Sequence, residues 1–314
     1  MPDTPSHSIN QHSTRMNLSA GIASASVAIT LVALKLWALG ETNALSVAAS
    51  LADSAMDLMV SLGALAAIWY AARPADEDHT FGHTAAEDLA ALGQSLFILV
   101  SAGIIAWAAV VRLMSGEPAP ILSHQKGMVV MGVSIGLTIA LVLWQRHVAA
   151  RTGSAVVKAD SLHYLGDLIP NIGAILSLWA ADLFAMEAVD SVVAIGAAIL
   201  LAVGAVRIFK TAWDGLMDRA APDEMIRGIE EIARSHPGVQ GFHDLKTRRS
   251  GSVIFVNMHI ELDGTQSLDD AHAIGASLRR AILRAYPMSD VMLHKDPVGV
   301  VPHPEDPSRG AHRR

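Results

Sequence analysis

The stretch Leu51-Ala-Asp-Ser-Ala-Met-Asp57 decides the fold, because it puts two acidic residues inside a long apolar segment. Between Glu41 and Arg73 almost every residue is apolar, small or hydroxylic, and Asp53 and Asp57 carry the only charges. An uncharged run of this length predicts a transmembrane helix. Residues four apart share one face of a helix, so the two carboxylates lie one above the other.

Two carboxylates inside a membrane need a compensating partner, because each costs at least about 2.5–3.5 kcal/mol. Acidic residues in such a setting usually mark an ion or substrate path. The alternative is that both face a polar interior of the helix bundle for structural reasons. The pattern favours a cation site.

The composition places most of the chain in lipid. Hydrophobic residues make up 52% of it and charged residues only 17%, where a soluble domain has about 25% charged residues. The net charge of −7 argues against nucleic acid as a partner. The chain has no cysteine, so disulfides and thiolate ligands are excluded, and any metal site must use His, Asp, Glu or backbone oxygen.

Apolar runs predict six transmembrane helices within residues 16–212, after a disordered start over residues 1–15. The runs cover about 16–40, 42–72, 89–111, 127–145, 156–183 and 191–206. Lys35 interrupts the first run, and a side chain of this kind can extend toward a membrane interface.

The distribution of Lys and Arg predicts the orientation. With six spans, one side holds most of the loop cations, namely Arg73, Arg146, Arg151, Lys158, Arg207, Lys210 and Arg219. The other side holds only Arg112 and Lys126. The first residues do not have the pattern of a signal peptide. We therefore expect a multi-pass protein with both termini in the cytoplasm.

A soluble domain is expected over residues 220–300, followed by a disordered tail over 301–314. Pro222-Asp-Glu begins a helix that runs to about Ser235. Strands are expected at 239–249, 253–262 and 289–294. A second helix is expected at 267–286, with Ser267 and Asp270 placed like a capping box. This order of elements predicts a small α+β fold.

The fifth span carries a second polar pair, because His163 and Asp167 are four residues apart and share a face. Together with Asp53 and Asp57 they form a set of four oxygen and nitrogen ligands. Such a set suits tetrahedral Zn²⁺, whereas Mg²⁺ and Ca²⁺ prefer more oxygens and no imidazole. An imidazole, whose ordinary pKa is about 6.5, can also exchange a proton for a metal ion. The alternative is a core histidine bonded to a hydroxyl.

Two further sets of residues are candidates. The loop after the second span contains Asp76, His79 and His83, although an ordinary polar loop has the same residue types. The soluble domain contains five polar side chains on different elements, His243, His259, His272, His294 and Asp296. Each of these alone is typical of a surface, and only their convergence would make a site.

The chain resembles the cation diffusion facilitators from about residue 16 to residue 300, through motifs that occur in order. The membrane part contains Ala52-Asp53-Ser54-x-x-Asp57, Asp78-His79-Thr-Phe-Gly-His83 and Ala159-Asp-Ser-Leu-His163-x3-Asp167. The soluble part contains Leu216-Met-Asp-Arg-Ala220, Pro237-Gly-Val, His243-Asp-Leu-Lys-Thr-Arg248 and His294-Lys-Asp296-Pro297.

The resemblance implies a homodimer of six-span protomers in a bacterial inner membrane, with a cytoplasmic ferredoxin-like, metallochaperone-like domain. It implies a secondary transporter and not an enzyme, with Zn²⁺ or Cd²⁺ efflux in exchange for protons by alternating access. Zn²⁺ would be both substrate and structural or regulatory ion. The implied transport site is Asp53, Asp57, His163 and Asp167. The implied loop site is Asp76, His79 and His83, and the implied binuclear cytoplasmic site is His243, His259, His272, His294 and Asp296, with Asp296 bridging two ions.

Two positions depart from the family pattern. Ala85 stands where relatives carry a Lys that pairs with an Asp at the start of the soluble domain, here Asp218. Lys295 replaces a neutral polar residue, and a cation there weakens nearby metal binding. Three alternatives stay open: Fe²⁺ or Mn²⁺ as the main cargo, a membrane metal sensor without transport, and an intramembrane hydrolase, for which no nucleophile and base are assembled.

Overall fold

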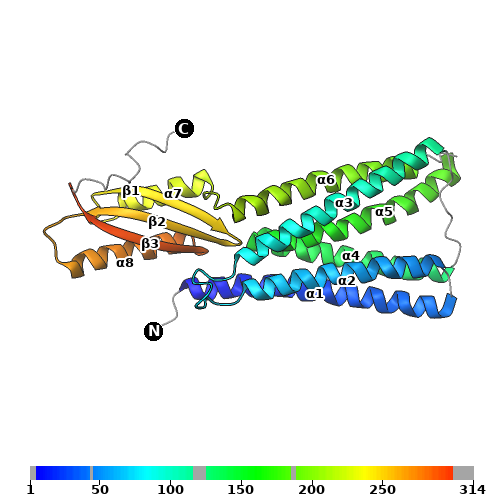
Figure 1. Ribbon diagram of the computed structural model, residues 1–314, viewed down its shortest axis with the longest axis horizontal. Coiled ribbons are helices and arrows are strands. Elements are labelled where there is room, and N and C mark those ends of the chain that lie inside the picture. The colour runs from blue at the N-terminus through cyan, green and yellow to red at the C-terminus, as the bar shows by residue number, and fades with distance from the viewer. Residues whose placement is uncertain (1–4, 43–44, 116–124, 185–188, 300–314) are drawn as a thin grey trace. The chain divides into compact units, whose positions relative to one another are not determined.

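The computed structural model of the protein describes residues 5–42, 45–115, 125–184 and 189–299. The chain folds into two compact units (Figure 1). One is Ser13–Trp213, and the other comprises Met1–His12 and Asp214–Arg314. The first unit is helical and the second combines helices with a sheet, which confirms the predicted fold class.

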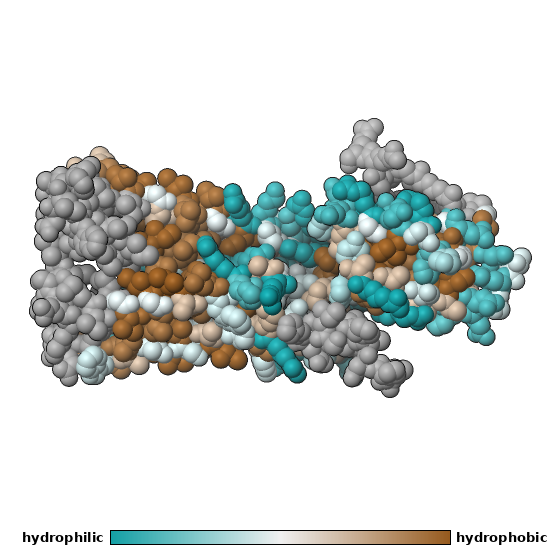
Figure 2. All heavy atoms as spheres, turned by 180° about the vertical axis from the view of Figure 1, so that it is seen from behind, coloured by the Kyte–Doolittle hydropathy of each residue, from teal (hydrophilic) through white to brown (hydrophobic). Residues whose placement is uncertain are grey.

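Six long helices, which lie side by side in Figure 1, make up the first unit. They are α1 (Pro5–Thr42), α2 (Leu45–Ala71), α3 (Ala85–Ser115), α4 (Gln125–Thr152), α5 (Ala155–Phe184) and α6 (Val189–Leu216). Only the ends of α1 and α6 fall outside Ser13–Trp213. Within the described residues, all except α5 contain a segment long and apolar enough to cross a membrane. The first half of α5 carries Lys158, Asp160 and Asp167. Figure 2 shows a mainly hydrophobic surface on the visible face of this unit.

Two boundaries in this unit differ from the expected ones. The helix α1 begins at Pro5, so it covers residues 5–15, where a disordered start was expected. Proline suits the first turn of a helix, and no glycine or proline lies between Pro5 and Gly21. The segment 1–4 and the expected tail over 301–314 lie outside the described residues.

The loop between α4 and α5 is shorter than expected. The basic loop expected near residues 146–158 is reduced to Gly153 and Ser154, and Gly153 adopts a φ of 74° that favours glycine.

Small side chains line the helix contacts of this unit. One buried cluster includes Ala20, Ala64, Ala91, Ala149, Ala155 and Ala159. In membranes such residues let helix backbones approach closely. The helix α5 packs against α3, α4 and α2, and this packing sets the position of its polar residues relative to α2.

The second unit contains α7 (Asp223–Ser235), β1 (Gly241–Ser250), β2 (Val253–Leu262), α8 (Leu268–Ala285) and β3 (Ser289–Pro297). The strand order is β1-β2-β3. The pair β1–β2 is antiparallel and the pair β2–β3 is parallel, so α8 forms the crossover between parallel strands. The predicted order helix–strand–strand–helix–strand is confirmed. The predicted cap is also present: Ser267 Oγ accepts a hydrogen bond from the Asp270 backbone N–H at 3.1 Å.

The middle strand β2 separates the apolar core from a polar face. Val256, Met258, Ile260 and Leu262 are buried and share a core with residues of both helices, including Ile229, Leu278 and Ile282. The residues between them, His259 among these, point to the opposite face because side chains alternate along a strand. Both helices therefore cover one face of the sheet, and the other face carries the histidines.

Candidate metal centres

The first cluster of potential ligands lies within the helical unit, on α2 and α5. Asp57 Oδ1 lies 3.2 Å from His163 Nε2. One ligand atom from each of Asp57, His163 and Asp167 lies within 4.8 Å of the other two. His163 is only 8% exposed. Two carboxylates and an imidazole at these separations can bind one cation between them.

Asp53, predicted as the fourth ligand, is not part of this group in the structure. It lies one turn from Asp57 along α2, about 6 Å in rise, and its side chain is exposed. The structure thus brings three of the four predicted residues together. Spacing along one helix shows which residues share a face, but not which of them lies level with the partner helix.

A buried polar network surrounds the cluster. Asp160 lies one turn before His163 on α5 and is 2% exposed. Its Oδ2 accepts a hydrogen bond from Gln145 Nε2 of α4 at 2.6 Å. This bond joins α4 to α5 next to His163. The sequence signal was present, because Asp160 is a charge within an apolar run, but the partner Gln145 could not be found from spacing.

Hydroxyl groups complete this network beside His163. Ser24 Oγ donates to Ser61 Oγ at 3.0 Å, and Ser61 Oγ shares a hydrogen bond with the Tyr164 hydroxyl at 2.8 Å. The His163 ring meets the Phe97 ring edge-on, with the ring centroids 5.7 Å apart. These contacts restrict the position of the imidazole and link α1, α2, α3 and α5 around it.

The second cluster lies in the loop between α2 and α3. Asp76 Oδ1 is 3.2 Å from His79 Nδ1, and Asp76 Oδ2 is 3.2 Å from His83 Nε2. Their ligand atoms lie within 4.8 Å of one another, so all three predicted loop residues converge. The backbone N–H of His79 donates to Asp76 at 2.6 Å, and this bond holds the pKa of Asp76 below its usual value. The carboxylate is therefore ready to accept a cation.

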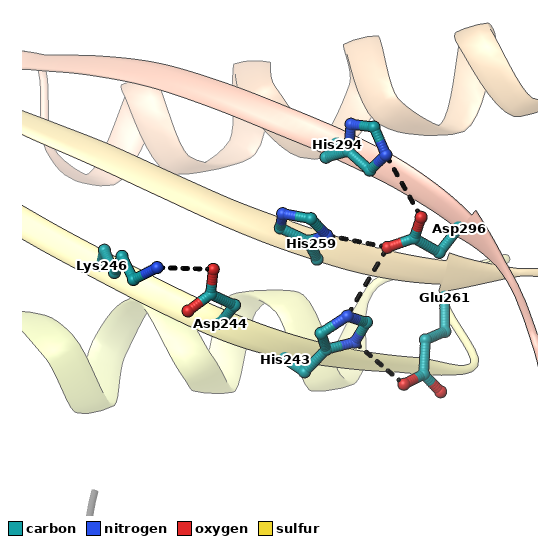
Figure 3. Close-up of polar contacts among 7 residues, drawn as sticks. All are labelled: His243, Asp244, Lys246, His259, Glu261, His294 and Asp296. Carbon is teal, nitrogen blue, oxygen red and sulfur yellow. Dashed lines mark hydrogen bonds and ion pairs between the residues drawn. The ribbon is translucent and has the colours of Figure 1, made fainter. Parts of the chain in front are cut away.

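The third cluster lies on the face of the sheet that the helices leave uncovered (Figure 3). His259 of β2 pairs with His243 of β1 on one side and with His294 of β3 on the other. Residues at one register position project to the same face of neighbouring strands. Strand pairing thus brings together three histidines that are distant in sequence.

Asp296 is the centre of this cluster. Its Oδ2 lies 2.8 Å from His259 Nδ1 and 3.6 Å from His243 Nε2, and its Oδ1 lies 3.2 Å from His294 Nε2 (Figure 3). A carboxylate that reaches imidazoles through both oxygens can bridge two cations. Glu261 Oε1 lies 3.1 Å from His243 Nδ1, a contact that the sequence analysis missed although Glu261 shares the face of His259.

His272, the fifth residue predicted for this cluster, does not join it in the structure. It is exposed on α8, and α8 packs against the core face of the sheet. The three other histidines lie on the opposite face. The structure thus brings four of the five predicted side chains together, and helix packing separates His272 from the strands of its own chain.

Comparison with known proteins assigns the family. The family model described as the cation efflux transmembrane domain matches residues 21–217. The one described as the cytoplasmic domain of cation efflux proteins matches residues 221–298. The chain belongs to the cation diffusion facilitator family. It is therefore a cation efflux transporter of the membrane.

Relatives of this family match almost the whole chain. The cation-efflux pumps FieF of Klebsiella pneumoniae (strain 342) and Escherichia coli O1:K1 / APEC are each 40% identical over 294 residues, which cover 94% of this chain and 97% of each relative. A solved structure, the metal-bound C-terminal domain of the CzcD transporter from Thermotoga maritima, is 32% identical. It covers 25% of this chain and 93% of its own, with a TM-score of 0.25.

The structure gives Asp218 a partner other than the residue at position 85. Asp218, whose usual lysine partner is replaced by Ala85, pairs with Arg248 Nη1 at 3.0 Å. This carboxylate therefore has a cationic partner within its own unit.

Proposed function

We propose that the protein exports Zn²⁺, with Cd²⁺ as a second substrate, across a bacterial inner membrane in exchange for protons. The observation that carries this proposal is the convergence of Asp57, His163 and Asp167 on α2 and α5, two packed helices of the helical unit. Carboxylate oxygen and imidazole nitrogen are ligands of tetrahedral Zn²⁺. Asp53, one turn away on α2, supplies a fourth ligand when its side chain turns toward Asp57.

Proton exchange follows from the same ligands. A carboxylate or imidazole must lose its proton before it binds a metal ion, so metal binding releases protons. An imidazole titrates near neutral pH when unperturbed. In this proposal the site alternates between the two membrane faces, loads Zn²⁺ from the cytoplasm, and returns with protons on His163 and one carboxylate.

The protein works as a homodimer with both termini in the cytoplasm. The excess of Lys and Arg in the loops of one side supports this orientation. The cluster around Asp296 binds zinc as a structural or regulatory ion and brings two protomers together. The loop cluster of Asp76, His79 and His83 binds a further ion at the cytoplasmic surface.

Zinc flux into proteoliposomes under an imposed pH gradient tests this proposal. An acidic interior should drive Zn²⁺ uptake, and a protonophore that collapses the gradient should stop it. Competition by Fe²⁺ and Mn²⁺ in the same assay measures the preference among metals that accept similar donors. Tight zinc binding without flux at any gradient would instead identify a membrane metal sensor.

A further inference from the structure

Lys35 is a charged residue inside the first candidate span, Ser13–Trp37, and none of the three clusters includes it. Its Nζ donates a hydrogen bond to Ser54 Oγ of α2 at 2.7 Å. Ser54 is 1% exposed and lies between Asp53 and Asp57 in the sequence. A lysine within a span is costly unless it has polar partners. Its partner here is the acidic segment of the neighbouring helix.

The ammonium of Lys35 acts on the carboxylates of the membrane cluster. The opposite charges near this ammonium belong to Asp57, Asp53 and Asp167. The ammonium and these carboxylates lie on three different helices, α1, α2 and α5. Between partly buried groups such interactions are stronger than in water, because the effective dielectric constant is lower.

The charges of these groups match a divalent cation. Ligands that hold a metal ion are deprotonated, so Asp57, Asp167 and, in the proposed site, Asp53 carry three negative charges when a cation is bound, and a neutral imidazole adds none. The ammonium of Lys35 reduces this to two. One divalent cation then balances the charges of Lys35, Asp53, Asp57 and Asp167, and balanced charges are less costly in a membrane than a net charge.

We propose that Lys35 is a positively charged neighbour of the transport site and lowers its affinity for divalent cations. It does so by opposing a cation that binds to Asp57, His163 and Asp167. Without it, a loaded site retains a negative charge, binds the cation more tightly and releases it more slowly. The effect on affinity is independent of the proposed function, and only the effect on transport rests on it.

Zinc titration of the full-length protein in detergent tests this inference. Asp76→Ala together with Asp296→Ala serves as the parent, so that the loop and sheet clusters do not obscure the membrane cluster. Adding Lys35→Met should raise the zinc affinity by about tenfold or more, because one repelling charge is removed from a poorly screened site. Lys35→Arg should keep the parent affinity. Lys210→Met, which removes an exposed lysine of α6, is the matched control and should also keep it.

An unchanged affinity in Lys35→Met, or an equal rise in Lys35→Arg, would overturn the inference. Lys35→Gln provides the same test of charge if the methionine variant does not fold. In proteoliposomes, Lys35→Met of the otherwise unmodified protein should carry zinc at least about tenfold more slowly, because tighter binding delays release. Absence of flux from the unmodified protein would refute the proposed transport function and leave the affinity result valid.

Discussion

Replacing Asp57 with alanine should lower gradient-driven zinc flux in proteoliposomes by at least about 100-fold. The change removes one of the three ligands that lie within 4.8 Å of one another and one of the charges that attract the cation. Loss of a residue that merely orients a metal ligand already costs about 10–100-fold, and loss of a ligand itself costs more. The protein should still fold, because removing a carboxylate from a membrane helix lowers its insertion cost.

Asp269→Ala is the matched control for this variant. Asp269 is an exposed carboxylate in the first turn of α8 and lies outside the helical unit, so its loss should leave flux unchanged. Size-exclusion chromatography and circular dichroism of both variants show whether they fold. A properly folded Asp57→Ala protein that transports zinc at the wild-type rate would refute the assignment of the site.

Replacing Asp296 with alanine should abolish zinc-induced compaction of the C-terminal domain. Asp296 is within 3.6 Å of three imidazoles through its two oxygens, and no other carboxylate that the structure describes at this cluster contacts all three. Its loss removes the bridging ligand and leaves His243, His259 and His294 without a shared partner. Small-angle scattering of the domain from residue 214 onward, with and without zinc, measures the effect.

Asp290→Ala tests whether the effect is specific to this position. Asp290 is an exposed carboxylate on the same strand and the same face as Asp296, six residues away, or about 20 Å along the strand. Its loss should leave the zinc-dependent change intact. If the Asp296→Ala domain still compacts with zinc as the wild type does, an ion bound at the sheet cluster does not bring the protomers together.

Periodicity predicted those parts of the fold that depend on local sequence. Apolar runs located the six helices of the first unit, because an α-helix satisfies its own backbone groups in lipid. Alternation along β2 separated Val256 and Met258 from His259, because strand side chains alternate between faces. The loop cluster also converged as predicted, since its members are close in sequence and a short turn suffices to bring them together.

Positions that depend on packing between elements could not be predicted from the sequence. Asp53 and Asp57 share one face of α2. Only the position of α5 along the axis of α2 decides which of the two carboxylates meets His163. His272 carries the same chemistry as His259, but α8 packs on the core face of the sheet. The hydrogen bond from Gln145 to Asp160 joins two helices through a geometry that no sequence pattern contains.

Zinc-edge X-ray absorption on the full-length protein tests the central claim most directly, with the other two clusters removed by Asp76→Ala and Asp296→Ala. The account predicts a retained zinc ion with a shell of oxygen and nitrogen ligands at about 2.0–2.2 Å. It also predicts an imidazole contribution that disappears when His163→Ala is added. A spectrum of hydrated zinc without imidazole, or one that His163→Ala leaves unchanged, would contradict the claim that the membrane cluster holds the transported cation.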